Sequence, residues 1–161
     1  MNIRKTKKED LEKVLEIYEY ARNQMRKNGN PNQWKNTNPS KDIIINDIEN
    51  ENSYLIEYKE EICGIFSFIV GEDPTYKKIE GSWLNNEDYG TIHRVASSGI
   101  RKGILKECLN FCEKKQKNIR IDTHEDNKIM QHLLEKNGYI NCGIIYVLDG
   151  SPRIAYQKIV K

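Results

Sequence analysis

The segment SSGIRKGIL, residues 97–105, decides how the rest of the chain is interpreted. It holds two glycines four residues apart and two adjacent cations. The apolar run YGTIHRVA (89–96) precedes it, and the segment KECLNFCEKK (106–115), with helical spacing, follows it. The first N–H groups of a helix lack intrahelical acceptors, so a glycine-containing, cationic turn between a strand and a helix can bind an anion such as phosphate.

Hydrophobic patterns and turn residues predict the elements on either side of this turn. Gly29 is well placed to end the first helix, Ser40 to begin the second, and the segment DGSP (149–152) predicts a tight turn between the last two strands. Strands are predicted at 1–5, 53–58, 61–70, 90–97, 118–124, 139–148 and 153–160, with a short one near Ile79, and helices at 6–29, 40–50, 103–117 and 127–138. The order predicts an α/β fold with a mixed sheet and helices on both faces.

Two local details of the helices are also predicted. Thr6 and Glu9 have the spacing of a capping box at the start of the first helix. In the last helix, Ile129 and Met130 are expected to face inward with Leu133 and Leu134.

Length, charge and composition limit the class of protein. A chain of 161 residues is expected to form a single domain, 1–161. The 26 cations and 24 anions nearly balance, which argues against a protein that coats nucleic acid. No apolar run approaches the roughly 20 residues of a membrane span, and the N-terminus lacks the apolar stretch of a secretory signal. We therefore expect a cytoplasmic protein without a nucleic-acid or membrane partner.

The four cysteines are expected to be free thiols, as is usual in a reducing compartment. Cys108 and Cys112 are one helical turn apart, but no further metal ligands lie near them in sequence. We predict that they pack in the core and that the protein binds no metal. The chain also contains neither GxGxxG opening a helix nor GxxxxGK[ST], so dinucleotide-binding and P-loop folds are not supported.

Two sequence motifs stand out in this element order. In the first, a strand that contains Val95 runs into Lys102, Gly103 and Ile104 and then a helix. The second is NKIMQHLLEKNGY (127–139). Together with the element order, they resemble the GNAT superfamily of acyl-CoA-dependent N-acetyltransferases over nearly the whole chain. In that family a strand runs into R-G-x-G-[IV]-G and a helix; Val95 matches the strand valine, and Lys102, Gly103 and Ile104 match the later positions. In the second motif the matching residues are Asn127, Leu133, Glu135, Lys136, Gly138 and Tyr139. The resemblance implies a central, mostly antiparallel sheet with a V-shaped splay and helices on both faces.

The chain departs from the family pattern at four positions. Ile100 and Arg101 replace the first Arg or Gln and the first Gly, and Leu105 replaces the last small residue. Leu105 could therefore crowd a pyrophosphate. Leu134 occupies the position of the tyrosine that often acts as general acid in the family.

The resemblance implies that acetyl-CoA is the co-substrate and that a primary amine of a small molecule or peptide is the acceptor. The pyrophosphate would then meet the N–H groups of Arg101, Lys102, Gly103, Ile104 and Leu105. The pantetheine arm would pair with the strand ending at Val95 and Ala96, and Asn127 would donate to it. An N–H near Arg94 or Val95 would polarise the thioester carbonyl.

A general base with a pKa near the working pH is needed to deprotonate the amine, and histidine suits that task. His93 is the first candidate, because alternation along its strand places it on the same face as Val95. His124, at the end of the next strand, is the second candidate, and His132 is expected at the surface. His93 could instead be a half-buried histidine that pairs with Asp122 or with a backbone carbonyl. A water relay from Glu80 or Asp122, or proximity alone, are further alternatives.

The acceptor pocket is expected beneath the loop between the first two helices, by analogy with the family. Trp34 in that loop is a candidate wall, or else an anchor to the core. Trp83 is a candidate second wall, and Glu80 could pair with a cationic amine.

Two other functions stay open. A non-catalytic acetyl-CoA-binding or regulatory module of the same fold would explain the residues at positions 100, 105 and 134. A nucleic-acid binder would use the short basic segments RKNGNPNQWKN (26–36) and KKQKNIR (114–120), against a near-zero net charge. A homodimer with contacts through the C-terminal strands is possible by analogy with such folds.

Overall fold

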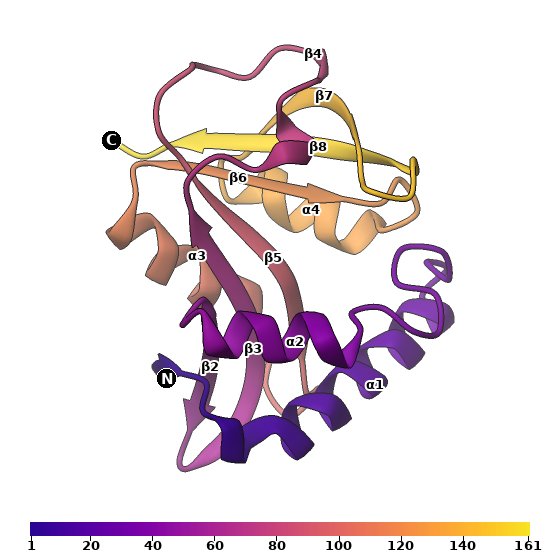
Figure 1. The fold of residues 1–161 in the computed structure, drawn as a ribbon, viewed down its shortest axis with the longest axis vertical. Coiled ribbons are helices and arrows are strands. Elements are labelled where there is room, and N and C mark those ends of the chain that lie inside the picture. Colours follow the sequence, from indigo (N-terminus) through magenta and orange to yellow (C-terminus); the bar gives the residue numbers. More distant parts are fainter.

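Eight strands form one sheet in the order β1-β2-β3-β5-β6-β8-β7-β4 in the computed structural model, which describes residues 1–161 (Figure 1). The strands are β1 (Asn2–Lys5), β2 (Ser53–Tyr58), β3 (Glu61–Val70), β4 (Glu80–Gly81), β5 (Gly90–Ser97), β6 (Asn118–Thr123), β7 (Ile140–Tyr146) and β8 (Pro152–Ile159). The helices are α1 (Leu11–Lys27), α2 (Lys41–Glu49), α3 (Ile104–Lys115) and α4 (Lys128–Lys136), with 3-10 turns at Lys8–Asp10 and Pro74–Tyr76. Each element predicted from the sequence is present, and β4 is the short strand expected near Ile79.

The sheet is antiparallel except where β5 and β6 meet. Their parallel pairing covers only Gly90 with Ile119 and Thr91 with Arg120. Beyond Thr91 the two strands diverge, so the edge of β5 that faces β6 has no partner strand (Figure 1). This divergence is the predicted V-shaped splay, and it divides the sheet into a half with β1, β2, β3 and β5 and a half with β6, β8, β7 and β4.

Helices cover both faces of the sheet, as predicted. In Figure 1, α1 and α2 lie in front of β3 and β5, while α4 lies behind β6 and β8. One core cluster lies under α1 and α2 and includes Val14, Tyr18 and Ile44. Another joins α3 and α4 to the opposite face and includes Leu109 and Leu134. Each fully buried side chain of this size contributes roughly 1.5–3 kcal/mol.

Gly64 on β3 lets the first turn of α3 approach the sheet. A Cβ atom at this position would lie 2.6 Å from Cγ2 of Ile104 and 3.1 Å from the carbonyl oxygen of Ala96. The absence of a side chain therefore sets the distance between α3 and the sheet, and with it the position of the turn before α3.

Two predicted details of the helices are wrong. The Thr6 hydroxyl is buried and hydrogen-bonds the Ser53 hydroxyl at 2.7 Å, while the Asp10 carboxylate accepts the Lys7 N–H. Ile129 is 55% exposed and does not join the apolar face of α4. Tertiary pairing with β2 recruits Thr6, and α4 is too peripheral to bury a fourth apolar side chain.

Gly29 has a φ of 82° just after α1, and the Ser40 hydroxyl accepts the N–H of Ile43, as predicted. The four cysteines are free thiols and all are buried. No helix combines the length and apolar character needed to cross a membrane. No three His, Cys, Asp or Glu side chains are grouped as metal ligands would be.

Candidate active site

A β-bulge in β5 lies where the splay begins to open. Ala96 pairs with Ile65 and His93 pairs with Ser67, so two residues of β5, Arg94 and Val95, stand opposite one residue of β3. Arg94 has a φ of 54°, a left-handed conformation that is uncommon for a residue with a side chain. A bulge leaves its extra residue out of the ladder and redirects the neighbouring side chains. Alternation placed His93 and Val95 on one face, and the bulge interrupts that alternation.

Buried polar side chains on the face of the sheet that α1 and α2 cover hold the bulge in place. Asp47 of α2 is 4% exposed and forms a bidentate ion pair with Arg94, at 2.7 Å to Nε and 2.8 Å to Nη2. The Ser67 hydroxyl donates to the same carboxylate at 2.7 Å. The Tyr18 hydroxyl donates to the carbonyl of Arg94 at 2.8 Å, and burial raises the pKa of Tyr18 above its usual value. Hydrogen bonds thus fix both the guanidinium and the carbonyl oxygen of Arg94, the residue that forms the bulge.

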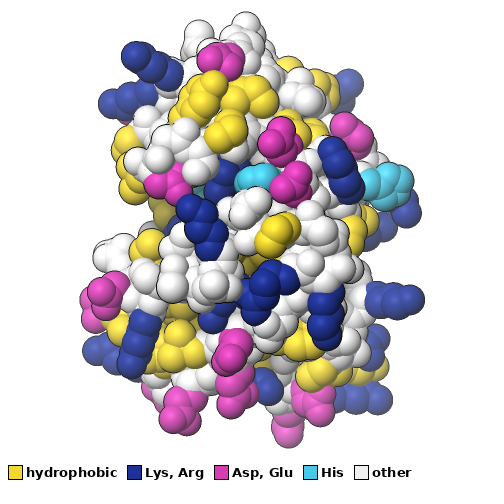
Figure 2. Space-filling model, turned by 90° about the vertical axis from the view of Figure 1, so that its right-hand side faces the viewer, with side chains coloured by type: hydrophobic (Ala, Val, Ile, Leu, Met, Phe, Trp, Pro, Cys, Tyr) yellow, Lys and Arg dark blue, Asp and Glu magenta, His cyan; other side chains and the backbone are white.

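A cavity of about 570 Å³ opens where β5 and β6 separate. It is bounded by β5 and β6, the α1–α2 loop, the segment after β3, the start of α4, and the loop between β7 and β8. In the view of Figure 2, which is turned by 90° from Figure 1, the surface has a hollow near its middle, with a histidine beside it and acidic and basic side chains around it. The lining residues with ionisable side chains are Asp73, His93, Arg94, Asp122, Asp149 and Arg153.

His93 and Asp73 form a hydrogen-bonded pair in this cavity. Nε2 of His93 lies 3.0 Å from Oδ2 of Asp73, and the other oxygen of Asp73 accepts the N–H and hydroxyl of Thr75. Burial would raise the pKa of Asp73, but the hydrogen bonds from His93 and Thr75 outweigh it and lower the pKa to about 2. The ionised carboxylate therefore keeps the proton of a neutral imidazole on Nε2 and leaves the lone pair on Nδ1. Nδ1 makes no hydrogen bond within the protein.

The other two histidines lie elsewhere. His124 follows β6, is absent from the lining of the cavity, and accepts the Asp126 N–H on Nδ1 at 3.0 Å. His132 on α4 is exposed, as predicted. Of the three histidines, only His93 lines the cavity.

The turn before α3 presents a row of free backbone donors. The first intrahelical hydrogen bond of α3 runs from Glu107 to the carbonyl of Gly103, so the N–H groups of residues 101–106 have no intrahelical acceptor and none donates to a side chain. Gly103 adopts a φ of 82° as the N-cap, and a side chain there would meet nothing within 4 Å. Ser98 anchors the other end by donating its N–H to the carbonyl of Cys63 at 2.9 Å. The turn therefore has the donors and the open space that an anion needs.

The side chains around the turn leave this space free. Ile104 and Leu105 are buried in the core cluster under α3, at 5% and 8% exposed, so Leu105 does not crowd the turn. Ile100 is exposed, and the guanidinium of Arg101 lies 3.5 Å above the ring of Tyr58.

Asn127 caps α4 by accepting the N–H of Met130 at 3.1 Å, and its amide donates to Gln33 at 3.0 Å. Gln33 belongs to the α1–α2 loop and also accepts from Asn30. The Asn127 side chain thus links the start of α4 to the α1–α2 loop, and both residues line the cavity.

The predicted acceptor residues divide into two groups. Trp34 lines the cavity and also packs edge-on against Tyr18, with ring centroids 5.6 Å apart. Trp83 instead packs against Tyr76 and donates to its carbonyl, and the exposed Glu80 accepts the Tyr146 hydroxyl. Neither Trp83 nor Glu80 lines the cavity, because the segment that carries them folds onto the far edge of the sheet at β7.

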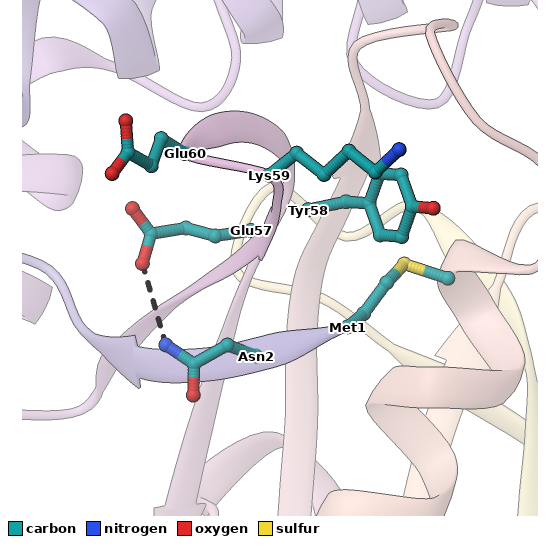
Figure 3. A pocket seen from close by; sticks show the side chains of 6 residues that line it. All are labelled: Met1, Asn2, Glu57, Tyr58, Lys59 and Glu60. Atoms are coloured by element: carbon teal, nitrogen blue, oxygen red, sulfur yellow. Dashed lines mark hydrogen bonds between the residues drawn. The ribbon is translucent and has the colours of Figure 1, made fainter.

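A second hollow, of about 390 Å³, lies at the β2–β3 turn (Figure 3). Its six lining residues come from the N-terminus and the hairpin, and Asn2 donates to Glu57 across it (Figure 3). It contains no histidine, cysteine or free helix N-terminus, so it offers little catalytic chemistry.

Comparison with known proteins assigns this geometry to a family. No protein-family model matches the chain, and no curated protein matches it. Among solved structures, a GNAT-family acetyltransferase from Streptococcus agalactiae 2603 is 33% identical, covers 99% of this chain and 95% of its own, and has a TM-score of 0.89. The chain belongs to the GNAT family of acetyltransferases.

More distant GNAT structures share the fold. A GNAT acetyltransferase from Listeria monocytogenes 4b F2365 is 19% identical over 99% of this chain and 94% of its own, with a TM-score of 0.74. A Salmonella typhimurium protein solved with its cofactor acetyl-CoA is 15% identical over 99% of this chain and 94% of its own, with a TM-score of 0.65. The family relationship supports acetyl transfer as the general activity.

Three residues of the site lie outside the GNAT motifs, and one motif position lacks the usual side chain. Leu134, at the position of the family's tyrosine, is fully buried, so it leaves no acid there. Asp73, Asp47 and Arg153 were missed because each is brought to the site by a different element. Asp73 had one local signal: it precedes Pro74 and caps a 3-10 turn, which fixes its side chain.

Proposed function

We propose that the protein transfers an acetyl group from acetyl-CoA directly to a primary amine of a small molecule or peptide. The observation that carries this proposal is the His93–Asp73 pair, which lies in a cavity next to the bulge of β5. A deprotonating group is what an amine acceptor requires before it can attack a thioester.

The residues present fit acetyl-CoA. The free N–H groups of residues 101–106 suit a pyrophosphate, and the space beside Gly103 lets the ligand approach the backbone. The β5 edge beyond Thr91, unpaired on the side of β6, suits the amide groups of a pantetheine arm, which can add like a strand. When bound, acetyl-CoA supplies an activated acyl group.

His93 takes the proton of the amine on Nδ1, because Asp73 holds the proton of the neutral ring on Nε2. Backbone N–H groups at the bulge, near Arg94 and Val95, polarise the acyl carbonyl. Overall, one C–S bond breaks and one C–N bond forms. The ammonium nitrogen gives up two protons, of which one is balanced by the proton that the departing thiol gains and the other is released to solvent. No tyrosine lines the cavity, so the proton of the departing thiol comes from His93 or from solvent.

Calorimetric titration of acetyl-CoA tests binding, on the natural protein and on Gly103→Pro. Proline removes one donor and cannot adopt a φ of 82°, so we expect affinity to fall at least about tenfold.

An amine screen with thiol detection then tests turnover in His93→Ala, with His132→Ala as the matched control because His132 is exposed. We expect His93→Ala to lower kcat about 10²- to 10⁴-fold and the control to match the natural protein.

The alternative function is a non-catalytic acetyl-CoA-binding or regulatory module, which the absence of a tyrosine at position 134 favours. Binding of acetyl-CoA without thiol release for every amine tested would support this alternative. Equal activity of His93→Ala and the natural protein would instead leave acetyl transfer in place and remove His93 as its base.

A further inference from the structure

Arg153 differs from the other charged residues that line the cavity. Arg94 pairs with Asp47, His93 pairs with Asp73, and no carboxylate lies within 4 Å of Arg153. Arg153 is nevertheless only 7% exposed, and a buried cation is costly unless something compensates its charge.

Two backbone carbonyls fix the position of this guanidinium. Nη1 donates to the carbonyl of Pro152 at 2.8 Å and Nη2 donates to that of Gln33 at 3.1 Å. A guanidinium has five N–H donors, so three have no acceptor in the protein. Arg153 is thus held between β8 and the α1–α2 loop, with donors left for a ligand.

The carboxylates of the cavity are already engaged. Asp73 accepts from His93 and Thr75, and Asp122 accepts the Tyr76 hydroxyl at 2.6 Å. Asp149 is exposed at the β7–β8 loop, where it accepts from Ser151 and pairs with Lys35 at 3.9 Å. Hydrogen bonds from Ser151 and the charges of Lys35 and Arg153 lower the pKa of Asp149, but Arg153 acts on it from beyond 4 Å. None of them provides a counter-ion to Arg153 within ion-pair distance.

Arg153 lines the same cavity as the proposed base. Ala155, two residues along β8, pairs with Asp122 on β6, so Arg153 and Asp122 project from the same face of the sheet. Arg153, Asp122 and His93 all line the one cavity. The remaining lining is largely apolar and includes Trp34, Ile43, Met25, Val147 and Leu148.

We propose that the acceptor is an amine that also carries a carboxylate, an amino acid in the broad sense, and that Arg153 binds this carboxylate. The amine then lies toward His93, and the apolar lining receives an apolar side chain. Arginine suits the task because its planar fork matches a carboxylate with two parallel hydrogen bonds. This inference rests on the proposed function and adds the class of acceptor to it.

The test compares leucine with leucinamide, which has the same shape without the negative charge, and extends to β- and γ-amino acids. The KM of each acceptor is measured by thiol release for the natural protein, Arg153→Gln and Lys13→Gln. Lys13 is an exposed cation of α1 and controls for the loss of one positive charge. For each acceptor, the KM of the variant is divided by the KM of the natural protein, and this ratio cancels the different basicities of the two amines.

We expect Arg153→Gln to raise the KM of leucine about ten- to hundredfold, while that of leucinamide changes less than about twofold. Arg153→Lys keeps the charge without the planar fork and should raise the KM of leucine by an intermediate factor. The lysine variant also provides the test if Arg153→Gln folds poorly. An equal change for leucine and leucinamide, or no preference for any carboxylate, would overturn the inference and leave acetyl transfer untouched.

Calorimetric titration of leucine and leucinamide into the CoA-saturated protein separates the two proposals. Binding of leucine that Arg153→Gln weakens, without thiol release from any amine, would support the carboxylate site and remove the proposed catalysis. Binding that does not distinguish leucine from leucinamide would overturn the carboxylate site.

Discussion

Replacing Asp47 with asparagine tests whether the buried ion pair sets the geometry of the β5 bulge. The asparagine keeps the shape of the side chain but removes the charge and turns one acceptor into a donor. It disrupts the hydrogen bonds from Arg94 Nε at 2.7 Å, Arg94 Nη2 at 2.8 Å and the Ser67 hydroxyl at 2.7 Å.

Loss of one partner from a buried ion pair costs about 3–5 kcal/mol. The Arg94 side chain retains 20% exposure and can regain some hydration, so we expect a loss of about 2–3 kcal/mol in the free energy of unfolding. For a chain of this length that corresponds to a fall of about 4–12 °C in Tm. Urea and thermal unfolding measure it, with Glu16→Gln as the control, because its exposed pair with Lys13 should contribute under about 1 kcal/mol.

The same variant should affect catalysis. Arg94 has a φ of 54°, and without Asp47 its backbone is free to relax to extended values that remove the bulge. We expect kcat to fall more than the affinity for acetyl-CoA. In a double-mutant cycle, adding Arg94→Gln to Asp47→Asn should cost less than about 1 kcal/mol further, because the pair is already broken. Stability within about 1 kcal/mol of the natural protein and an unchanged kcat would refute the reasoning and indicate that strand pairing alone sets the bulge.

Three further substitutions have expected outcomes. The lowered pKa of Asp73 stabilises the fold above about pH 4 and this stability is lost as the pH falls toward 2, so Asp73→Asn should flatten the dependence of Tm on pH there; equal slopes would contradict it. Gly64→Ala should destabilise the fold by about 1–3 kcal/mol and weaken acetyl-CoA binding, because its Cβ meets Ile104; unchanged calorimetry would contradict it. Gly103→Ala meets no neighbour and keeps its N–H, so it should cost only about 1 kcal/mol of stability and change acetyl-CoA affinity a few-fold at most; a loss as large as that from proline would show that strain dominates.

Much of the fold follows from local patterns in the sequence. Alternation, helical spacing and turn residues predicted every main element, because those signals arise within about ten residues of chain. The GNAT resemblance added the splay, which no local pattern encodes. The capping box at Thr6 failed because a hydroxyl of β2, far away in sequence, competes for the same side chain.

The candidate site divides in the same way. The N–H groups before α3 could be predicted, since free donors at a helix N-terminus are a property of the backbone and need no particular side chain. The position of Leu105 could not, because whether its side chain crowds the turn depends on the core that receives it.

The sequence by itself determined the order of elements, the turn with free N–H groups before α3, and His93 as a candidate base. Only the tertiary structure decided which residues surround His93. It brought Asp73 to its ring, placed Arg153 in the same cavity, and moved Trp83 and Glu80 to the far edge of the sheet. The physical reason is that side-chain pairing across a splayed sheet depends on contacts between segments 20 or more residues apart, whose register and bulges are fixed only when the strands assemble.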